Sequence, residues 1–157
     1  MKLYEYQARE LFAEHGISVL PGRLASSVGE AREAARELGG KVAVKAQVLA
    51  GGRGKGGGVV LAKTAEEAQA AAEKILGMQL ITKQTGEQGV EVKTILFEQG
   101  VKLKEELYLS ILVDREQSDI VIITSRDGGM DIEKVADETP DRIITVHVNP
   151  LLGLQGY

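Results

Sequence analysis

A glycine tract at residues 51–58, with the sequence GGRGKGGG, constrains the fold of this chain more than any other feature. Six of its eight residues are glycine. Each glycine inside ordered structure costs about 0.5–1 kcal/mol relative to alanine. A simple turn needs only one or two. The tract therefore predicts a backbone that approaches another group closely, or that moves, or both.

Three phosphate-binding designs can be compared with the tract. A Walker A loop requires Ser or Thr after Gly-Lys, but Gly56 stands there. Gly52, Gly54 and Gly57 match the letters of a dinucleotide-binding fingerprint, but residues 59–61 are β-like where that motif needs a helix. The third design is a glycine-rich hairpin that folds over phosphates as a lid, and it fits a tract between two predicted strands.

The segment around the tract is purely basic, although the chain carries a formal net charge of −4. Residues 41–65 contain no acid and five cations, which are Lys41, Lys45, Arg53, Lys55 and Lys63. Backbone N–H groups freed of side chains and nearby cations both favour anionic oxygens. We therefore favour a phosphate lid over a solvated loop with incidental cations. Strand alternation leaves Lys45 free to face a cleft.

The chain is predicted to mix helices and strands without strict alternation, a fold class of α/β to α+β. Helical spacing and capping residues predict helices at residues 3–15, 28–38 and 65–76. Short β-runs predict a strand after Pro21 and strands at residues 41–48, 59–62, 78–82, 92–98, 107–113, 120–124 and 143–148. Residues 114–119 are expected to form a hairpin turn, and residues 131–139 either a short helix or a loop.

Composition excludes several classes of function. The chain has no cysteine, which excludes disulfides and zinc–thiolate sites, and its histidines, His15 and His147, are too far apart in sequence for a multi-histidine metal site. An aromatic content of 4% and the negative charge argue against nucleic-acid binding. No apolar run approaches the roughly 20 residues that cross a bilayer, and no secretory signal is present, so we expect a cytoplasmic protein.

Several segments, in order and with matching spacing, resemble the beta subunits of succinyl-CoA synthetases. They are residues 3–8 (LYEYQA), 44–48 (VKAQV), 50–55 (AGGRGK), 105–109 (EELYL), 113–115 (VDR), 127–136 (DGGMDIEKVA) and 138–140 (ETP). The resemblance covers the chain from end to end. It implies an ATP-grasp fold, in which two lobes hold a nucleotide. Residues 1–19 would be an N-terminal helix and linker on the second lobe, residues 20–102 the first, lid-bearing lobe, and residues 103–157 an incomplete second lobe.

The resemblance also implies a set of nucleotide-binding residues, which are Lys45, Gly52, Arg53, Gly54, Glu98, Val101 and Glu106. Lys45 would contact the nucleotide, and the three tract residues would cover its phosphates. Glu98 and the Val101 backbone would meet the adenine edge, with Glu106 near the ribose. No catalytic residue and no metal ligand is implied within the chain. In the family, a partner alpha subunit carries the phosphohistidine, and the Mg²⁺ ligands lie further along the beta subunit.

The implied reaction interconverts succinate, CoA and ATP with succinyl-CoA, ADP and phosphate in a hetero-oligomer of the tricarboxylic acid cycle. The choice between ATP and GTP, linked to residues near Leu20 and Pro21, stays open. The chain is expected to be a fragment, with weak nucleotide binding, no ligase activity by itself and exposed apolar surface on its second lobe. Two alternatives stay open as well: a malate–CoA ligase beta subunit, and a non-catalytic nucleotide-binding or assembly module.

Overall fold

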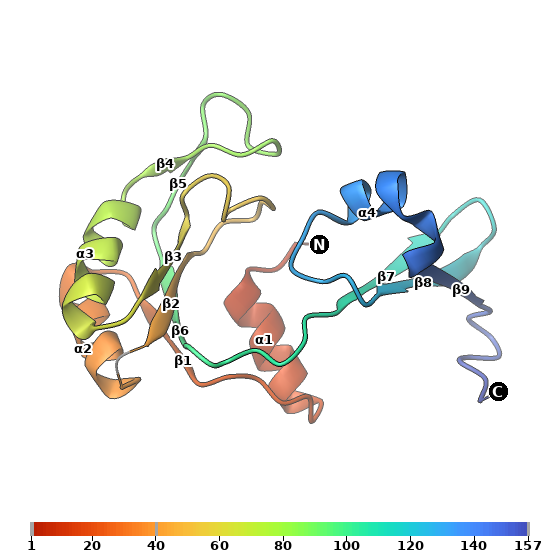
Figure 1. Ribbon diagram of the computed structural model, residues 1–157, viewed down its shortest axis with the longest axis horizontal. Coiled ribbons are helices and arrows are strands. Elements are labelled where there is room, and N and C mark those ends of the chain that lie inside the picture. Colours follow the sequence, from red (N-terminus) through yellow and green to blue (C-terminus); the bar gives the residue numbers. More distant parts are fainter. Residues whose placement is uncertain (1, 40, 157) are drawn as a thin grey trace. The chain divides into compact units, whose positions relative to one another are not determined.

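A computed structural model describes residues 2–39 and 41–156 of the chain (Figure 1). The chain divides into two compact units, Met1–Val101 and Lys102–Tyr157. Within the described residues, no helix combines the length and the apolar character that a membrane span requires.

The first unit contains three helices and six strands among its described residues. They are α1 (Glu5–Glu14), β1 (Gly22–Ala25), α2 (Val28–Glu37), β2 (Val42–Ala46), β3 (Val59–Ala62), α3 (Ala65–Ile75), β4 (Gln79–Leu80), β5 (Val90–Glu91) and β6 (Ile95–Gln99). Four of these strands form one sheet in the order β1-β6-β2-β3, and every pairing in it is antiparallel. This sheet therefore lies at the α+β end of the predicted fold class.

Helices α2 and α3 begin at the expected capping residues. The Ser27 hydroxyl accepts a hydrogen bond from the Glu30 N–H at 3.3 Å, and the Glu30 carboxylate accepts one from the Ser26 N–H at 2.7 Å. The Thr64 hydroxyl accepts from the Glu67 N–H at 3.2 Å at the start of α3. Each cap satisfies a backbone donor that the helix leaves unpaired, so local sequence fixes both starting points.

Alternation along the sheet separates a core face from a polar face. Helices α2 and α3 cover one face of the sheet (Figure 1), where Val44 and Phe97 pair across β2 and β6 and are completely buried. Lys45 and Glu98, each one residue further along its strand, point to the opposite face. The helices contribute mainly small side chains to this core, namely Ala31, Ala34, Ala35, Ala68, Ala71 and Ala72. The sheet thus buries its apolar face under the helices, and Lys45 and Glu98 lie outside that core.

The strand β5 was not predicted. Residues between the expected strands at 78–82 and 92–98 were expected to form a loop, but Val90 and Glu91 pair with Leu80 and Gln79 of β4. The expected strand at 92–98 begins only at Ile95. A pairing two residues long leaves almost no periodicity in the sequence, which explains why pattern reading missed it.

Helix α1 is anchored at both ends by local hydrogen bonds. The Tyr4 N–H donates to Gln7 Oε1 at 3.0 Å, and Gly16, at φ +76°, ends the helix as expected. His15 Nδ1 lies 2.8 Å from the Leu11 carbonyl oxygen, which can only accept, so Nδ1 carries the proton. In the structure α1 belongs to the first unit, which ends at Val101. Packing of α1 on the second lobe stays a prediction.

The second unit is an antiparallel sheet of β7 (Tyr108–Asp114), β8 (Asp119–Ser125) and β9 (Ile143–Val148), with α4 (Ile132–Glu138) and a 3-10 turn, η1 (Pro140–Arg142), between β8 and β9. The hairpin predicted at residues 114–119 is confirmed, since Asp114 pairs with Asp119. For residues 131–139 the sequence allowed either a short helix or a loop, and the structure shows the helix α4. The turn η1 was not predicted.

One face of the second sheet is apolar and exposed. Leu109, Ile111 and Val113 of β7 are 63–75% exposed, and Ile144 of β9 is 59% exposed. These residues share a face, because Leu109 and Ile144 both pair with Thr124 of β8. The expectation of exposed apolar surface on this lobe is confirmed.

Candidate functional site

Lys45 lies in a charged cluster on the polar face of the first sheet. We use the term charged cluster for Glu5, Arg9, Lys45, Arg53 and Glu98. Lys45 Nζ is 2.6 Å from Glu98 Oε2 and 3.1 Å from Glu5 Oε1. The three side chains are only 13–24% exposed. Such shielded ion pairs are stronger than surface pairs, because water screens them less.

Arg53 turns back from the glycine tract onto strand β2. Its Nη1 lies 2.8 Å from Glu5 Oε2 and 2.8 Å from the carbonyl oxygen of Ala46. Glu5 therefore uses one carboxylate oxygen for Lys45 and the other for Arg53. A single anionic group spans the two cations that the sequence predicted at the phosphates.

Arg9 completes the charged cluster from the next turn of α1. It forms an ion pair with Glu98 and a hydrogen bond to the carbonyl of Leu20. Residues four apart lie on one face of a helix, so α1 presents Glu5 and Arg9 together to the sheet. Glu98 consequently has two cationic partners, Lys45 and Arg9.

Gln47 fixes the start of α1 to the end of β2. It is 4% exposed, and its Oε1 accepts from the Tyr6 N–H at 3.2 Å. Its Nε2 lies 3.2 Å from the Lys45 carbonyl oxygen and 3.4 Å from Glu5 Oε2. These bonds hold the Glu5 carboxylate next to the cations.

The charged cluster keeps Glu5 ionised. Burial by itself would raise the pKa of the Glu5 carboxyl. The charges of Arg53 and Lys45, together with their hydrogen bonds, outweigh burial and lower that pKa below its usual value. Glu5 is therefore an anion at neutral pH.

Most glycines of the tract have a structural reason to be glycine. A Cβ on Gly56 would lie 2.6 Å from the Ile81 carbonyl oxygen, and a Cβ on Gly58 would lie 3.0 Å from a methyl group of Leu80. Two others, Gly52 and Gly57, have φ values of +76° and +79°, which side chains disfavour. Fold alone therefore explains much of the glycine content that the sequence suggested was needed for a ligand.

Gly54 differs from these four glycines. A Cβ there would meet nothing within 4 Å, and its φ lies outside the left-handed region. Neither packing nor backbone geometry requires glycine at this position. An absent side chain at Gly54 is consistent with close approach of a ligand to the backbone.

Replacing Gly54 and Gly56 separately with alanine is expected to distinguish the two reasons for glycine, which are close approach of a ligand at Gly54 and packing at Gly56. Gly54→Ala should change the free energy of unfolding by less than about 0.5 kcal/mol but weaken several-fold the ATP binding that the family resemblance implies. Gly56→Ala should lower the free energy of unfolding by about 1–3 kcal/mol, because its Cβ collides with backbone. Chemical denaturation and ATP titration of both variants provide the measurements. Wild-type ATP affinity in Gly54→Ala would rule out close approach there.

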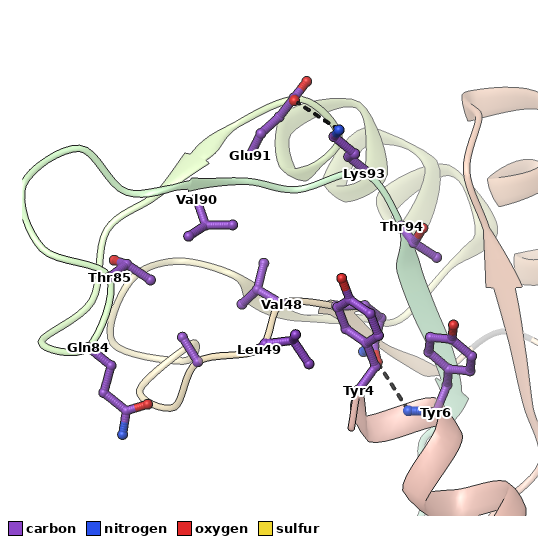
Figure 2. A pocket seen from close by; sticks show the side chains of 12 residues that line it. Tyr4, Tyr6, Val48, Leu49, Gln84, Thr85, Val90, Glu91, Lys93 and Thr94 are labelled. Atoms are coloured by element: carbon purple, nitrogen blue, oxygen red, sulfur yellow. Dashed lines mark hydrogen bonds and ion pairs between the residues drawn. The ribbon is translucent and has the colours of Figure 1, made fainter. Parts of the chain in front are cut away.

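A pocket of about 670 Å³ adjoins the charged cluster within the first unit. Figure 2 shows its lining side chains coming from the start of α1, the segment after β2, and the region around β4 and β5. The rings of Tyr4 and Tyr6 stack at its edge, with centroids 5.7 Å apart. Gln47 joins this pocket to Glu5. None of the seven expected nucleotide-binding residues lines it.

Glu106 belongs to the second unit and lies against the turn at Asp127. A Cβ on Gly128 would be 2.5 Å from the Glu106 carbonyl carbon, and one on Gly129 would be 2.6 Å from the Glu106 carboxylate. The Gly128 N–H donates to the Glu106 carbonyl at 3.2 Å. The segment at residues 127–129, to which sequence analysis gave no role, thus holds Glu106 in place.

His147, at the end of β9, pairs with Asp119 through Nδ1 and Oδ2, 3.0 Å apart. The other Asp119 oxygen is buried without a hydrogen-bond partner among the described residues. With Asp114, these residues offer three ligand atoms within 4.8 Å of one another. The pairing with Asp119 indicates a structural role for His147.

The structure brings together three of the expected site residues, Lys45, Arg53 and Glu98. Sequence analysis missed Glu5 and Arg9, although their four-residue spacing on a predicted helix was a usable signal. Val101 lies three positions beyond Glu98 and is 45% exposed. Separately, Leu20 and Pro21, which were linked to nucleotide preference, line a pocket of about 370 Å³ together with Arg9.

Comparison with known proteins defines the class to which this fold and site belong. The family model for the ATP-grasp domain matches residues 2–157. The chain belongs to the ATP-grasp family. Its curated relatives include the beta subunits of ADP-forming succinate–CoA ligases from Desulfatibacillum aliphaticivorans, 58% identical, and from Desulforapulum autotrophicum, 60% identical. Each match covers 100% of this chain and 41% of the relative, so the chain spans less than half of their length.

Solved structures support the same fold. ATP citrate lyase from Methanothrix soehngenii, in complex with citrate and coenzyme A, matches 98% of this chain and 36% of its own, with a TM-score of 0.71 and 24% identity. A dinucleotide-forming acetyl-coenzyme A synthetase from Ca. Korarchaeum cryptofilum matches 78% of this chain and 52% of its own, with a TM-score of 0.64 and 25% identity. The predicted ATP-grasp fold is confirmed.

Proposed function

We propose that this chain supplies the nucleotide-binding part of an ADP-forming succinate–CoA ligase. The complete enzyme would convert succinate, CoA and ATP to succinyl-CoA, ADP and phosphate, and the reverse. A phosphohistidine on a partner alpha subunit would carry the phosphoryl group between the nucleotide and the acyl site. A cytoplasmic location stays a prediction. The names of the relatives at 58% and 60% identity support this substrate assignment.

The observation that carries the proposal is the convergence of Lys45 and Arg53 next to the glycine tract. One carboxylate reaches both cations, so a phosphate group of similar size can do the same. Gly54 leaves the backbone open for close approach. In our proposal Lys45 and Arg53 bind phosphate oxygens, and the backbone at Gly52 and Gly54 covers them.

The adenine contact is proposed to differ in detail from what the sequence suggested. The Glu98 carboxylate is already paired with Lys45 and Arg9. Glu98 would therefore hold Lys45 in position, and the exposed Val101 at the end of the first unit would present its backbone to the adenine edge. Glu106 is proposed to contact the ribose.

Magnesium does not fit the carboxylates of the charged cluster. In the structure, Glu5 is paired with Lys45 and Arg53, and Glu98 with Lys45 and Arg9, so both carboxylates already face cations of the chain. The Mg²⁺ that accompanies ATP would need ligands from elsewhere in the enzyme.

Replacing Lys45 with methionine is expected to weaken ATP binding by at least about tenfold, because the phosphates lose a shielded cation. Lys63→Met is the matched control, since Lys63 lies in the same acid-free segment but is exposed. Titration calorimetry or amide chemical-shift titration with ATP measures both. Equal affinity in wild type and Lys45→Met would contradict the placement of the phosphates at Lys45.

A further inference from the structure

Glu5 occupies the position between the two proposed phosphate-binding cations. Its two carboxylate oxygens lie 3.1 Å from Lys45 Nζ and 2.8 Å from Arg53 Nη1. Both cations have another partner: Lys45 is paired with Glu98, and Arg53 is bonded to the Ala46 carbonyl. Without Glu5, Lys45 therefore keeps an anionic partner and Arg53 keeps a hydrogen-bond acceptor.

A polyphosphate that binds Lys45 and Arg53 needs the same faces of these cations. If the Glu5 carboxylate stayed in place, it would lie beside the phosphate oxygens, and two anions at that distance repel in a shielded site. Glu5 is ionised at neutral pH, so it cannot escape this repulsion by being protonated already.

We propose that Glu5 is an internal competitor of the polyphosphate, and that its carboxylate must leave Lys45 and Arg53 before a nucleotide binds. The proposal rests on the nucleotide site proposed above. Glu5, in the first turn of α1, would then lower the affinity of the site for polyphosphate. In the absence of nucleotide, the single negative charge of Glu5 lies between Lys45 and Arg53 and reduces their mutual repulsion.

The test compares wild type, Glu5→Gln and Glu10→Gln by amide chemical-shift titration of the isotope-labelled chain. Glutamine keeps the size of Glu5 but removes the competing charge, and it replaces one of the two acceptor oxygens with an NH2 group. Glu10 is exposed on the same helix, so Glu10→Gln controls for a general change in charge. Each protein is titrated with ATP, with inorganic tripolyphosphate and with adenosine.

For Glu5→Gln we expect roughly tenfold tighter binding of ATP and tripolyphosphate, and unchanged binding of adenosine. Glu10→Gln should match wild type for all three. A merely structural role of Glu5 would alter adenosine binding as well. Equal or weaker binding of tripolyphosphate by Glu5→Gln would overturn the proposal.

A second variant keeps the test decisive if Glu5→Gln fails to fold. Glu5→Asp retains the charge but is one methylene shorter, so it cannot reach both cations, and we expect an intermediate gain in tripolyphosphate affinity. No gain in Glu5→Asp would count against the proposal. Failure of the nucleotide site itself would look different, because ATP would then leave the amides around Lys45 and the glycine tract unperturbed in every variant.

Discussion

Replacing Phe97 with alanine is expected to lower the free energy of unfolding of the first unit by about 3–5 kcal/mol. Phe97 is completely buried at the centre of β6, where it pairs with Val44 of β2. Among the described residues it is also the largest fully buried side chain. The helices over this face contribute mostly alanine, which is too small to fill the resulting cavity.

Amide hydrogen exchange in β2 and β6 measures this effect for the first unit separately from the second. The chain provides a matched control, because its other phenylalanine, Phe12, is 50% exposed on α1. Phe12→Ala should cost less than about 1 kcal/mol. Similar losses at Phe12 and Phe97 would contradict a core centred on β6.

Replacing Glu98 with alanine is expected to lower the free energy of unfolding of the first unit by about 2–4 kcal/mol. Glu98 is 13% exposed and is paired with Lys45 and Arg9. Without it, Arg9 is left in a shielded site with only its bond to the Leu20 carbonyl among the contacts described, and Lys45 keeps Glu5 alone. Removing one partner of a buried pair is costly because the remaining charge stays desolvated.

The control for this prediction is an ion pair on the surface. Glu91 lies 3.9 Å from Lys93, and the two side chains are 52% and 80% exposed. Glu91→Ala should therefore change the free energy of unfolding by less than about 0.5 kcal/mol. Chemical denaturation followed by circular dichroism compares the two variants. If Glu98→Ala were as mild as Glu91→Ala, the charged cluster would be solvated rather than shielded.

The glycine tract illustrates what composition can and cannot reveal. Its position between β2 and β3 was predicted from the flanking β-runs, and the structure agrees. Sequence alone suggested one common reason for six glycines. The structure separates them, since Gly56 and Gly58 make room for the β4 region while Gly54 lies in the open. Packing between residues more than twenty positions apart determines which of these glycines the fold requires. The sequence pattern of the tract contains no information about that packing.

Local sequence by itself determined the helices α2 and α3 and the strands β3 and β9, because capping residues and apolar alternation act within a few positions. It also indicated a basic, glycine-rich phosphate site, whereas the ATP-grasp fold was implied by the family resemblance. Only the tertiary structure decided the partners of Lys45, which are Glu5 and Glu98, 40 and 53 positions away in the sequence. The Glu98 contact depends on the pairing of β2 with β6, and the Glu5 contact depends on how α1 approaches the sheet. No local pattern therefore predicted that a carboxylate would bridge the two cations.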